Sequence, residues 1–403
     1  MVVFPERFRE DAGKVISLID GSGGYIVHHD DADGLSSAAI LKACFERKGL
    51  NFSFICLEKL FPKVVEKVHE KGLPVVYADL GSPHADTISS KNCGKNVVLI
   101  LDHHDPRPCS DPMVFDLNLE HYGFSGERDF SASTVAYLFS LIVDERNFDL
   151  SYLALVGSKE IPSGFTGLNA RILDDALDKG VLKKDRKIEI VKFSVSIDEL
   201  FSALQILGSV GYYRGGPNVG IRVALEGFSS ESKKFLEELE GERKEANRRL
   251  LAILYRSGLK ETKYIQYFDS RNMFNGMGSK VLGTFCSYLS YQKSLVKADK
   301  YLLGYMDLLD EVPSFGKLDE RLAKVSVRVP EGLRKAVEED RMPSAIDILS
   351  VAEEMGGFSD GHEFAASCVI PKDSLEKFIA EVDKLVEDWV NGVRRVKRKA
   401  VID

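Results

Sequence analysis

The first third of the chain alternates short apolar runs with longer segments whose apolar residues recur at helical spacing. Such runs predict buried strands, and the segments between them predict helices. The expected strands are residues 24–29, 52–56, 74–79 and 97–102, and the expected helices are residues 36–48, 62–71, 83–90, 131–143 and 151–157. Strands that alternate with helices are typical of a parallel sheet that helices cover on both faces.

The second half of the chain predicts a long helix followed by another α/β unit. Residues 208–218 are too glycine-rich for a helix interior. Residues 229–254 combine Glu, Lys and Arg with leucines at helical spacing, which predicts a long connecting helix. Beyond it, the expected strands are residues 263–268, 299–305, 324–329 and 365–370, and the expected helices are residues 278–290, 344–355 and 372–392.

We therefore predict a two-lobed α/β protein, with an N-terminal parallel-sheet domain and a smaller C-terminal α/β domain joined by a helical linker. A chain of 403 residues is too long for one ordinary hydrophobic core, which supports this division. The expected parts are an N-terminal domain at residues 1–190, a linker region with the long helix at 191–258, a C-terminal domain at 259–392 and a basic tail at 393–403.

The composition narrows the functional classes. No apolar run approaches the ~18 residues of a membrane-spanning helix, and the N-terminus lacks a secretory signal pattern, so we expect a cytoplasmic location. Six scattered cysteines without a Cys-x-x-Cys pair argue against a zinc ribbon or a redox motif. A net charge of −8 gives no general attraction for nucleic acid, so contact with a polyanion must be local and assisted by metal ions. The basic stretch Arg394–Lys399 is the exception, either as a solvated terminus or as an arm that contacts phosphate.

Four of the eight histidines lie in two stretches that also concentrate aspartates, residues 28–34 and 102–105. Each stretch follows a predicted strand, and the carboxyl edge of a parallel sheet is where such folds bind ligands. In an extended segment, His29, Asp31 and Asp33 share one face. Clustered carboxylates need cations to neutralise them, and mixed imidazole and carboxylate ligands suit Mn²⁺, or Mg²⁺ where oxygens dominate. The alternative is a solvated acidic turn that caps a helix.

Two further strand ends carry candidate groups. A lone Asp such as Asp79 is usually a helix cap, but a carboxylate between two sites can bridge metal ions about 3.5–4 Å apart. Next to each other, His103 and His104 point in different directions, so one can ligate metal while the other contacts phosphate. Asp102 would fix the tautomer of a ligand imidazole through a hydrogen bond. The alternative is two core histidines satisfied by hydrogen bonds.

A fourth motif lies near the C-terminus, at residues 360–366. Gly361 and His362, followed by small residues, suit a loop whose amides and imidazole hold a phosphate, although a packed turn explains the glycine equally well. Arg328, at the end of a predicted strand, is a candidate partner donor. A surface salt bridge is the alternative for this arginine.

Together these motifs resemble those of the DHH phosphoesterase superfamily. Asp102-His103-His104 spells the name of that family, residues 29–34 are similar to its His-x-Asp-x-Asp-Gly motif, and Asp79 matches its second motif. Residues 360–366 are similar to the signature of its associated C-terminal domain. The length and the stretch at residues 211–217 resemble the archaeal RecJ-like members most, which are related to the RecJ single-strand exonucleases and distantly to the DHH-derived subunit of the replicative helicase.

The resemblance implies a role for each matching residue. It implies two Mn²⁺ or Mg²⁺ ions in the cleft, held by His29, Asp31, Asp33, Asp79 and His103. Asp102 would stand behind these ligands, and His104 would face the scissile phosphate. From the C-terminal lobe, Arg328, Gly361 and His362 would bind the strand.

The chain departs from the family pattern at the fourth motif. The family has an Asp after the helix that corresponds to residues 153–157, and here Ile161 stands at that position, with Glu160 one residue out of register. Glu160 would need local rearrangement to substitute. In the C-terminal signature, Asp360 stands at the first glycine and Ser367 at the glycine that usually follows the double Ala. Loss of one ligand would weaken the second metal site.

The leading hypothesis from this resemblance is a metal-dependent phosphodiesterase, a single-strand-specific exonuclease on DNA or RNA. One alternative, motivated by Ile161, is a weakly active or inactive replisome component that binds single strands and GINS or the replicative helicase. Another alternative is a phosphodiesterase for short oligonucleotides or cyclic dinucleotides.

Overall fold

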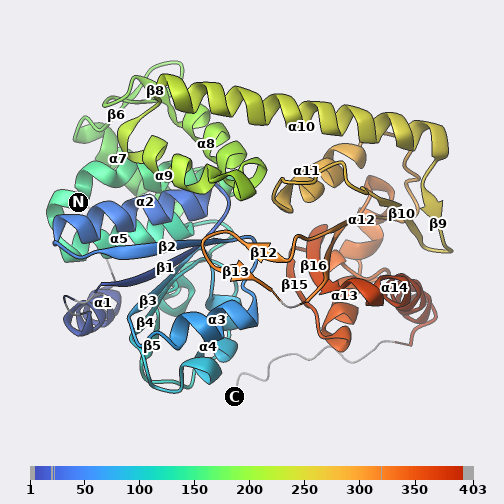
Figure 1. The fold of residues 1–403 in the computed structure, drawn as a ribbon, viewed down its shortest axis with the longest axis horizontal. Coiled ribbons are helices and arrows are strands. Elements are labelled where there is room, and N and C mark those ends of the chain that lie inside the picture. The colour runs from blue at the N-terminus through green and yellow to red at the C-terminus, as the bar shows by residue number, and fades with distance from the viewer. Residues whose placement is uncertain (1–4, 20, 22, 319, 394–403) are drawn as a thin grey trace. The chain divides into compact units, whose positions relative to one another are not determined.

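The computed structural model describes residues 5–19, 21, 23–318 and 320–393. These residues fall into two compact units (Figure 1). Unit 1 comprises residues 1–239 and 312–316, and unit 2 comprises residues 240–311 and 317–403. The basic stretch Arg394–Lys399 lies outside the described residues. Among the helices that the structure describes, none is both long and apolar enough to cross a membrane.

A five-stranded parallel sheet forms the centre of unit 1, with the strand order β2-β1-β3-β4-β5. The strands are β1 (Gly24–His29), β2 (Phe52–Leu57), β3 (Val75–Ala78), β4 (Val98–Leu101) and β5 (Val114–Asp116). Every residue of β3 and β4 is buried, as expected for strands that are covered on both faces. The predicted parallel sheet is confirmed, together with its first four strands. The short strand β5 was not predicted.

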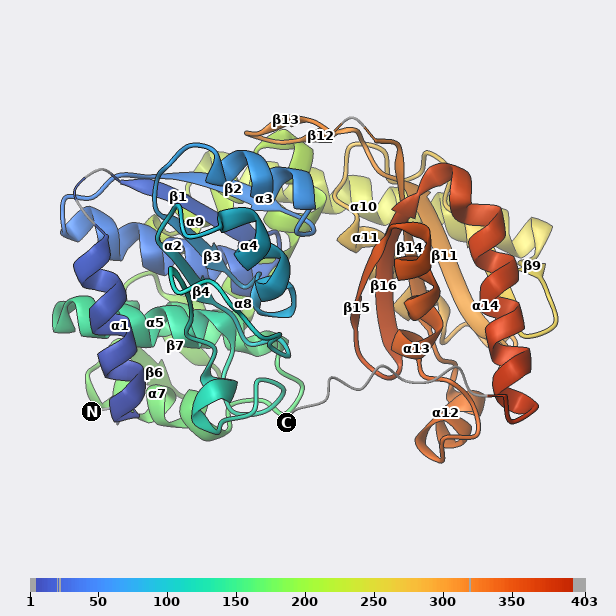
Figure 2. The same ribbon diagram turned by 90° about the horizontal axis from the view of Figure 1, so that it is seen from below.

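Helices cover both faces of this sheet (Figure 2). The chain steps from β1 outward to β2 and then back across β1 to β3, so right-handed crossovers place α2 on one face and α3 on the other. The helices of unit 1 are α1 (Glu6–Leu18), α2 (Ala32–Arg47), α3 (Pro62–His69), α4 (Ala85–Asn92), α5 (Ala132–Val143), α6 (Ser151–Gly157), α7 (Gly167–Asp178), α8 (Ile197–Gln205) and α9 (Gly216–Glu226).

Two predicted boundaries in unit 1 are wrong. Helix α2 begins at Ala32 rather than at Ser36, because Asp31 caps it by accepting a hydrogen bond from the backbone nitrogen of Gly34 at 2.9 Å. The glycine-rich stretch is also partly helical, since α8 continues into a π-helical turn at Ile206–Val210. Gly208 is required in that turn because a Cβ there would lie 1.8 Å from the carbonyl oxygen of Asp30.

Beyond this turn the chain leaves unit 1 through one long helix. Helix α10 (Ser230–Ser257) confirms the predicted connecting helix, and the division between the two units falls inside it, after Leu239. Unit 1 also contains a small antiparallel sheet of β6 (Leu182–Lys184), β7 (Ile188–Ile190) and β8 (Val195–Ser196).

Unit 2 contains a six-stranded mixed sheet with the order β15-β16-β14-β11-β10-β9. Its strands are β9 (Lys260–Glu261), β10 (Ile265–Asp269), β11 (Tyr301–Asp307), β14 (Leu322–Arg328), β15 (Phe358–Gly361) and β16 (Ala365–Pro371). Its helices besides α10 are α11 (Lys280–Leu289), α12 (Glu331–Glu338), α13 (Ala345–Leu349) and α14 (Leu375–Val390). The short pair β12 (Glu311–Val312) and β13 (Gly316–Lys317) interrupts the chain between β11 and β14.

The two faces of the unit 2 sheet carry different helices, and β14 shows how the sequence directs this. Its alternate residues Val325 and Val327 enter the buried core with α13 and α14, while Ser326 and Arg328 face α11. The predicted strands of this region are confirmed to within a few residues. Strands β9 and β15 and helix α12 were not predicted.

Candidate metal centre

The candidate centre lies at the point where the strand order of the unit 1 sheet reverses. Strands β1 and β3 are neighbours, with His28 paired to Ala78, and β3 pairs with β4 through Ala78 and Leu101. The chain runs outward from β1 in one direction and from β3 in the other, which makes this edge a topological switch point. Open α/β sheets bind their ligands at such points. Three adjacent strand ends therefore deliver the candidate residues to one place.

One group of possible ligands consists of His29, Asp31 and Asp79. One nitrogen or oxygen of each lies within 4.8 Å of the others. The Nδ1 atom of His29 is 2.5 Å from Oδ2 of Asp31 and 3.4 Å from Oδ2 of Asp79. An imidazole and two carboxylates form a donor set that suits Mn²⁺.

A second group consists of Asp79, His103 and His104, again with donor atoms within 4.8 Å of one another. The Nε2 atom of His103 is 3.6 Å from Oδ1 of Asp79. Asp79 therefore turns one oxygen toward His29 and the other toward His103. This is the arrangement that a carboxylate bridging two ions requires.

The electrostatics of this cluster fit a cation. Asp30, Asp31, Asp33, Asp79 and Asp102 are all at most 3% exposed. Burial, followed by the charges of Asp31 and Asp33, raises the pKa of Asp79 well above its ordinary value. Oδ1 of Asp79 is buried and accepts no hydrogen bond from the described residues. A divalent ion would neutralise the repulsion among these carboxylates. It would also give Oδ1 of Asp79 a partner.

Asp33 occupies a position between this cluster and the start of α5. Its two oxygens accept hydrogen bonds from the backbone nitrogens of Ala132 and Ser133, each at 2.9 Å, and Oδ2 lies 3.9 Å from Nε2 of His103. A carboxylate at a helix N-terminus is stabilised by the helix dipole. Gly157 leaves room for this contact, since a Cβ there would lie 2.2 Å from Oδ1 of Asp33.

Asp102 orients His104 rather than the imidazole of His103. Its Oδ1 accepts hydrogen bonds from Nδ1 of His104 and the backbone nitrogen of His103, both at 2.7 Å. The backbone nitrogen of Ser82 donates to Oδ2 at 2.9 Å. Although burial acts to raise the pKa of Asp102, His104 and these donors hold it below the ordinary value. Since His104 belongs to the second group of possible ligands, the role of Asp102 behind a ligand imidazole stays a prediction.

Several residues that hold this loop were not predicted from the sequence. Nδ1 of His103 faces the carbonyl oxygen of Gly126 at 3.2 Å, and a Cβ on Gly126 would lie 1.9 Å from the carbonyl oxygen of His103. The side chain of Asn118 donates to the carbonyl oxygen of His104 at 2.7 Å, and Asp116 accepts from the hydroxyl of Ser82 at 2.9 Å. Asp116 ends β5, and Asn118 and Gly126 follow it, so an expectation of that strand was the only signal that could have found these three.

The three candidate substrate residues of unit 2 lie together at one end of its sheet. Arg328 pairs with Ala365 and Gly361 pairs with Ala366, while His362 begins the tight turn between β15 and β16. Gly361 has φ +137° and no room for a Cβ, which would lie 2.4 Å from Cα of Ala366. The motif is therefore a hairpin turn rather than an open loop.

Arg328 is engaged within unit 2. Its guanidinium donates to the carbonyl oxygens of Gly283 and Val327, both at 2.7 Å, and to the hydroxyl of Ser287 at 2.8 Å. A further bond joins it to the hydroxyl of Ser326 at 3.3 Å. These bonds fasten α11 to β14 and leave one N–H of the guanidinium for another partner. A role in substrate binding stays a prediction.

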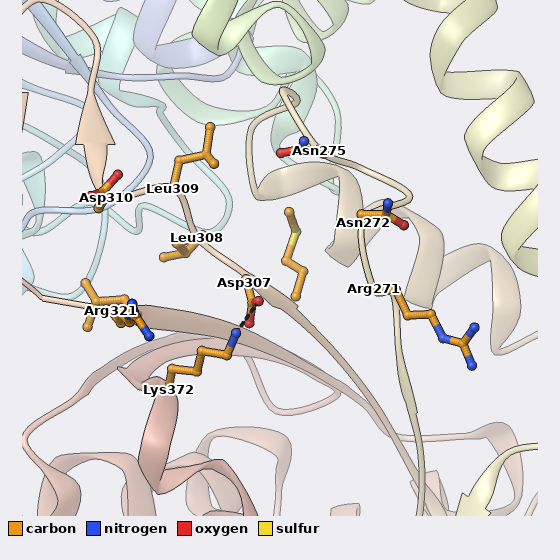
Figure 3. A pocket seen from close by; sticks show the side chains of 11 residues that line it. Arg271, Asn272, Asn275, Asp307, Leu308, Leu309, Asp310, Arg321 and Lys372 are labelled. Carbon is orange, nitrogen blue, oxygen red and sulfur yellow. Dashed lines mark hydrogen bonds and ion pairs between the residues drawn. The ribbon is translucent and has the colours of Figure 1, made fainter.

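A cavity of about 620 Å³ lies at the other end of the same sheet (Figure 3). In its lining, Nζ of Lys372 forms an ion pair with Oδ2 of Asp307 at 2.5 Å. The other residues that line it are Arg271, Asn272, Asn275, Met306, Leu308, Leu309, Asp310, Arg321 and Leu322. None of the predicted site residues lines this cavity.

A comparison with family models identifies one segment of unit 1. Residues 25–158 match the model described as the DHH family, N-terminal domain. This segment is a DHH domain. It contains both groups of possible ligands and extends from β1 to the end of α6. The resemblance read from the motifs is confirmed.

Relatives share the architecture beyond the DHH domain. An uncharacterized protein of Methanocaldococcus jannaschii is 26% identical over 427 aligned positions, which cover 90% of this chain and 93% of that protein. A crystal structure of RecJ from Thermus thermophilus in complex with Mn²⁺ has a TM-score of 0.67 at 17% identity, covering 96% of this chain and 55% of RecJ. The chain thus spans about half the length of that protein.

Two more solved structures show the same fold. The exonuclease RecJ bound to manganese has a TM-score of 0.63 at 17% identity and covers 98% of both chains. CDC45 from Entamoeba histolytica has a TM-score of 0.50 at 12% identity and covers 95% of this chain and 99% of CDC45. These likenesses confirm the predicted two-lobed α/β fold, in which the DHH domain belongs to the first lobe.

The residues that directly follow the DHH domain include the position where the family has its fourth-motif Asp. Ile161 is 4% exposed and belongs to the apolar core. The carboxylate of Glu160 accepts a hydrogen bond from the side chain of Gln205 in α8. Its neighbour Lys159 forms an ion pair with Asp198 of the same helix at 2.8 Å. Among the described residues, neither group of possible ligands includes Glu160.

Proposed function

We propose that this protein is a metal-dependent phosphodiesterase that degrades single-stranded DNA or RNA from an end. The observation that carries the proposal is the pair of ligand groups, with buried carboxylates, that share Asp79 at the switch point of the DHH domain. The fold likeness to exonuclease RecJ, whose structures contain Mn²⁺ or Mg²⁺, supports the type of ion and the class of substrate.

Two ions would be held by five side chains of unit 1, namely His29, Asp31, Asp33, Asp79 and His103. Divalent ions bound there would supply positive charge next to a phosphate and lower the pKa of a coordinated water. Asp33 would act as a weaker ligand than the others, because two backbone amides already use its oxygens.

The protein would contribute an oriented imidazole to the reaction. Asp102 accepts from Nδ1 of His104, which leaves Nε2 of the ring to face a substrate. The side chain of His104 is 40% exposed, so a phosphate oxygen can reach it. A protonated Nε2 would donate to that oxygen and stabilise the charge that develops in the transition state.

A time course of strand degradation tests this proposal. DNA and RNA of several lengths, labelled at one end, are incubated with the protein and either Mn²⁺ or Mg²⁺. We expect stepwise shortening from one end, and loss of this activity in the double variant Asp79→Ala, His103→Ala. Asp178→Ala, an exposed Asp of the same unit, is the matched control and keeps full activity. Equal degradation by the wild type and the double variant would contradict the proposal. Cleavage restricted to dinucleotides or cyclic dinucleotides would assign the activity to short substrates instead.

A second candidate function is a replisome component that binds single strands and GINS or the replicative helicase. The burial of Ile161 and the engagement of Glu160 by Gln205 favour it, because they remove one expected carboxylate from the centre. Calorimetric titration with Mn²⁺ and a pull-down with purified GINS separate the two candidates. A replisome scaffold would retain GINS without a second metal-binding event, whereas the nuclease would bind two ions per chain.

A further inference from the structure

The exposed tyrosines of this protein gather in one corner of unit 2. Among the described residues, three tyrosines belong to the exposed large apolar side chains, namely Tyr255 at 48%, Tyr288 at 49% and Tyr291 at 69% exposure. Tyr255 lies at the end of α10, and the other two lie at the end of α11 and in the turn that follows it. Helix α11 runs alongside the second half of α10 (Figure 1). Exposed aromatic groups in a cluster mark a binding surface more often than scattered ones do.

Contacts with neighbouring side chains hold two of these rings in place. The hydroxyl of Tyr255 donates to the side-chain oxygen of Gln292 at 3.2 Å and lies 3.2 Å from the hydroxyl of Ser294. Gln292 directly follows Tyr291, so the segment that carries Tyr291 lies beside Tyr255. Tyr288 rests on the buried ring of Phe285, with the ring centroids 6.5 Å apart. The rings of Tyr255 and Tyr288 are thus positioned before any ligand binds.

The surroundings of this tyrosine corner are basic in an acidic protein. Residues 251–300 contain eight basic and three acidic residues, a net charge of +5, whereas the whole chain carries −8. Glu261 is engaged by Lys297 at 2.6 Å and by Lys300 at 2.9 Å. Arg256 and Lys293 are exposed, and the described part of the chain offers them no ion pair. Free cations therefore flank the exposed rings.

We infer that this tyrosine corner, made of Tyr255, Tyr288, Tyr291, Arg256 and Lys293, binds single-stranded nucleic acid apart from the metal centre. Unpaired bases stack on aromatic rings regardless of sequence, and lysine and arginine contact the adjacent phosphates. Tyrosine and arginine are also common in protein interfaces, so the net positive charge of residues 251–300 is what favours a polyanion over a protein partner. The inference deepens the proposed function, since a strand held here would be retained between successive cleavage steps.

Binding without catalysis tests this surface. Fluorescence anisotropy of a labelled oligo(dT) of about 15 nucleotides is measured with the full chain in EDTA, so that no hydrolysis is needed. We expect the dissociation constant to rise about tenfold for Tyr288→Ala and again for Tyr291→Ala. Tyr288→Phe and Tyr291→Phe keep the ring and should bind as the wild type does. Phe148→Ala removes an exposed ring of unit 1 and is the matched control.

The outcomes separate this surface from the catalytic proposal. Unchanged binding in both alanine variants would overturn the inference, and so would a wild type that binds no oligonucleotide in EDTA, which would leave a protein as the partner. Hydrolysis of a dinucleotide with Mn²⁺, measured in parallel, reports on the metal centre alone. If the wild type binds the oligonucleotide in EDTA but degrades neither this strand nor the dinucleotide with Mn²⁺, the proposed function is overturned and the tyrosine corner stands.

Discussion

Among single residues, Asp79 is the most important for the proposed metal centre, because it belongs to both groups of possible ligands. Its backbone has φ +58°, which is uncommon for a residue other than glycine, although its nitrogen still donates to the carbonyl oxygen of Leu101 at 2.9 Å and so extends the sheet. Such strained conformations persist where the surroundings enforce them, often at functional sites. Here the conformation places the carboxylate between His29 and His103.

Replacing Asp79 by Asn should make the metal-free protein more stable and abolish its response to Mn²⁺. The substitution keeps the shape and removes one of several buried charges that repel one another, so we expect a gain on the order of 1 kcal/mol in the free energy of unfolding in EDTA. Thermal unfolding with EDTA and with Mn²⁺ measures both effects. Asp178→Asn, on the exposed end of α7, should change neither. Mn²⁺ stabilisation of Asp79→Asn equal to that of the wild type would contradict the ligand assignment.

His69 should make the protein less stable in mild acid. Its side chain is 2% exposed and contacts the hydroxyl of Tyr77 at 2.9 Å, and burial lowers the pKa of His69 to about 4, with Asp111 opposing the shift. The unfolded chain binds this proton near pH 6.5, so the contribution of neutral His69 to stability is complete above that pH and falls as the pH drops toward 4. The total loss is roughly 3 kcal/mol at most.

Urea denaturation at several pH values between 7.5 and 4 measures this effect. His69→Gln should be less stable than the wild type at neutral pH, because it loses the packing of the ring, and should lose less stability on acidification. A wild type and a variant that lose stability in parallel would show that another group controls the acid response.

The same scale shows which site residues the sequence could predict. His29, Asp31 and Asp33 alternate in a short segment after an apolar run, so local spacing alone indicated their shared face. Gly126 and Asn118 carry no such local signal, because their contacts with the Asp102–His104 loop come from segments more than ten residues away. The preference of Asp102 for His104 over His103 depends on ring orientations that spacing does not determine.

At the element scale, the N-terminus of α5 ties the acidic motif to the rest of the DHH domain. Asp33 receives both of its close backbone hydrogen bonds there, and α6 packs close enough that Gly157 touches Asp33. The backbone of Gly157 has φ −63°, so it needs the missing side chain for space and not for conformation. The sequence predicted element boundaries well where an apolar run was long. It missed the start of α2, because the residue that caps this helix, Asp31, lies inside the acidic motif.

Gly157→Ala should destabilise the protein and weaken metal binding together. The new Cβ would lie 2.1 Å from the hydroxyl oxygen of Ser133 and 2.2 Å from Asp33, so we expect a loss of about 1–3 kcal/mol from overpacking. Gly241→Ala in α10 is the matched control, because nothing lies within 4 Å of its Cβ position and alanine favours a helix by roughly 0.5–1 kcal/mol. Urea denaturation and calorimetry with Mn²⁺ measure the two effects. A Gly157→Ala variant as stable as the wild type would contradict the described packing.

At the scale of the whole molecule, the sequence predicted two α/β lobes and a connecting helix, and the solved relatives share that fold. The sequence could not predict the shortest strands. Strand β5 and the antiparallel sheet of β6, β7 and β8 have strands of two or three residues, too short for a periodic pattern. The position of the unit boundary inside α10 depends on long-range packing, which no local pattern reports.

Divalent ions should stabilise unit 1 and leave the stability of unit 2 unchanged. An ion that binds the folded form at a concentration 100 times its dissociation constant adds about 2.7 kcal/mol. We therefore expect Mn²⁺ to slow hydrogen exchange in β1, β3 and the segments that follow them, and to leave the unit 2 sheet unchanged. Hydrogen exchange with mass spectrometry resolves the two units. Equal protection in both would contradict a centre confined to unit 1.

We propose that the strand ends of the DHH domain hold a pair of divalent ions around Asp79. Anomalous diffraction from crystals grown with Mn²⁺ tests it most directly, because it locates the ions themselves. The account predicts two peaks, one beside His29, Asp31 and Asp79 and one beside Asp79 and His103. A map with no manganese in contact with the carboxylate of Asp79 would contradict it.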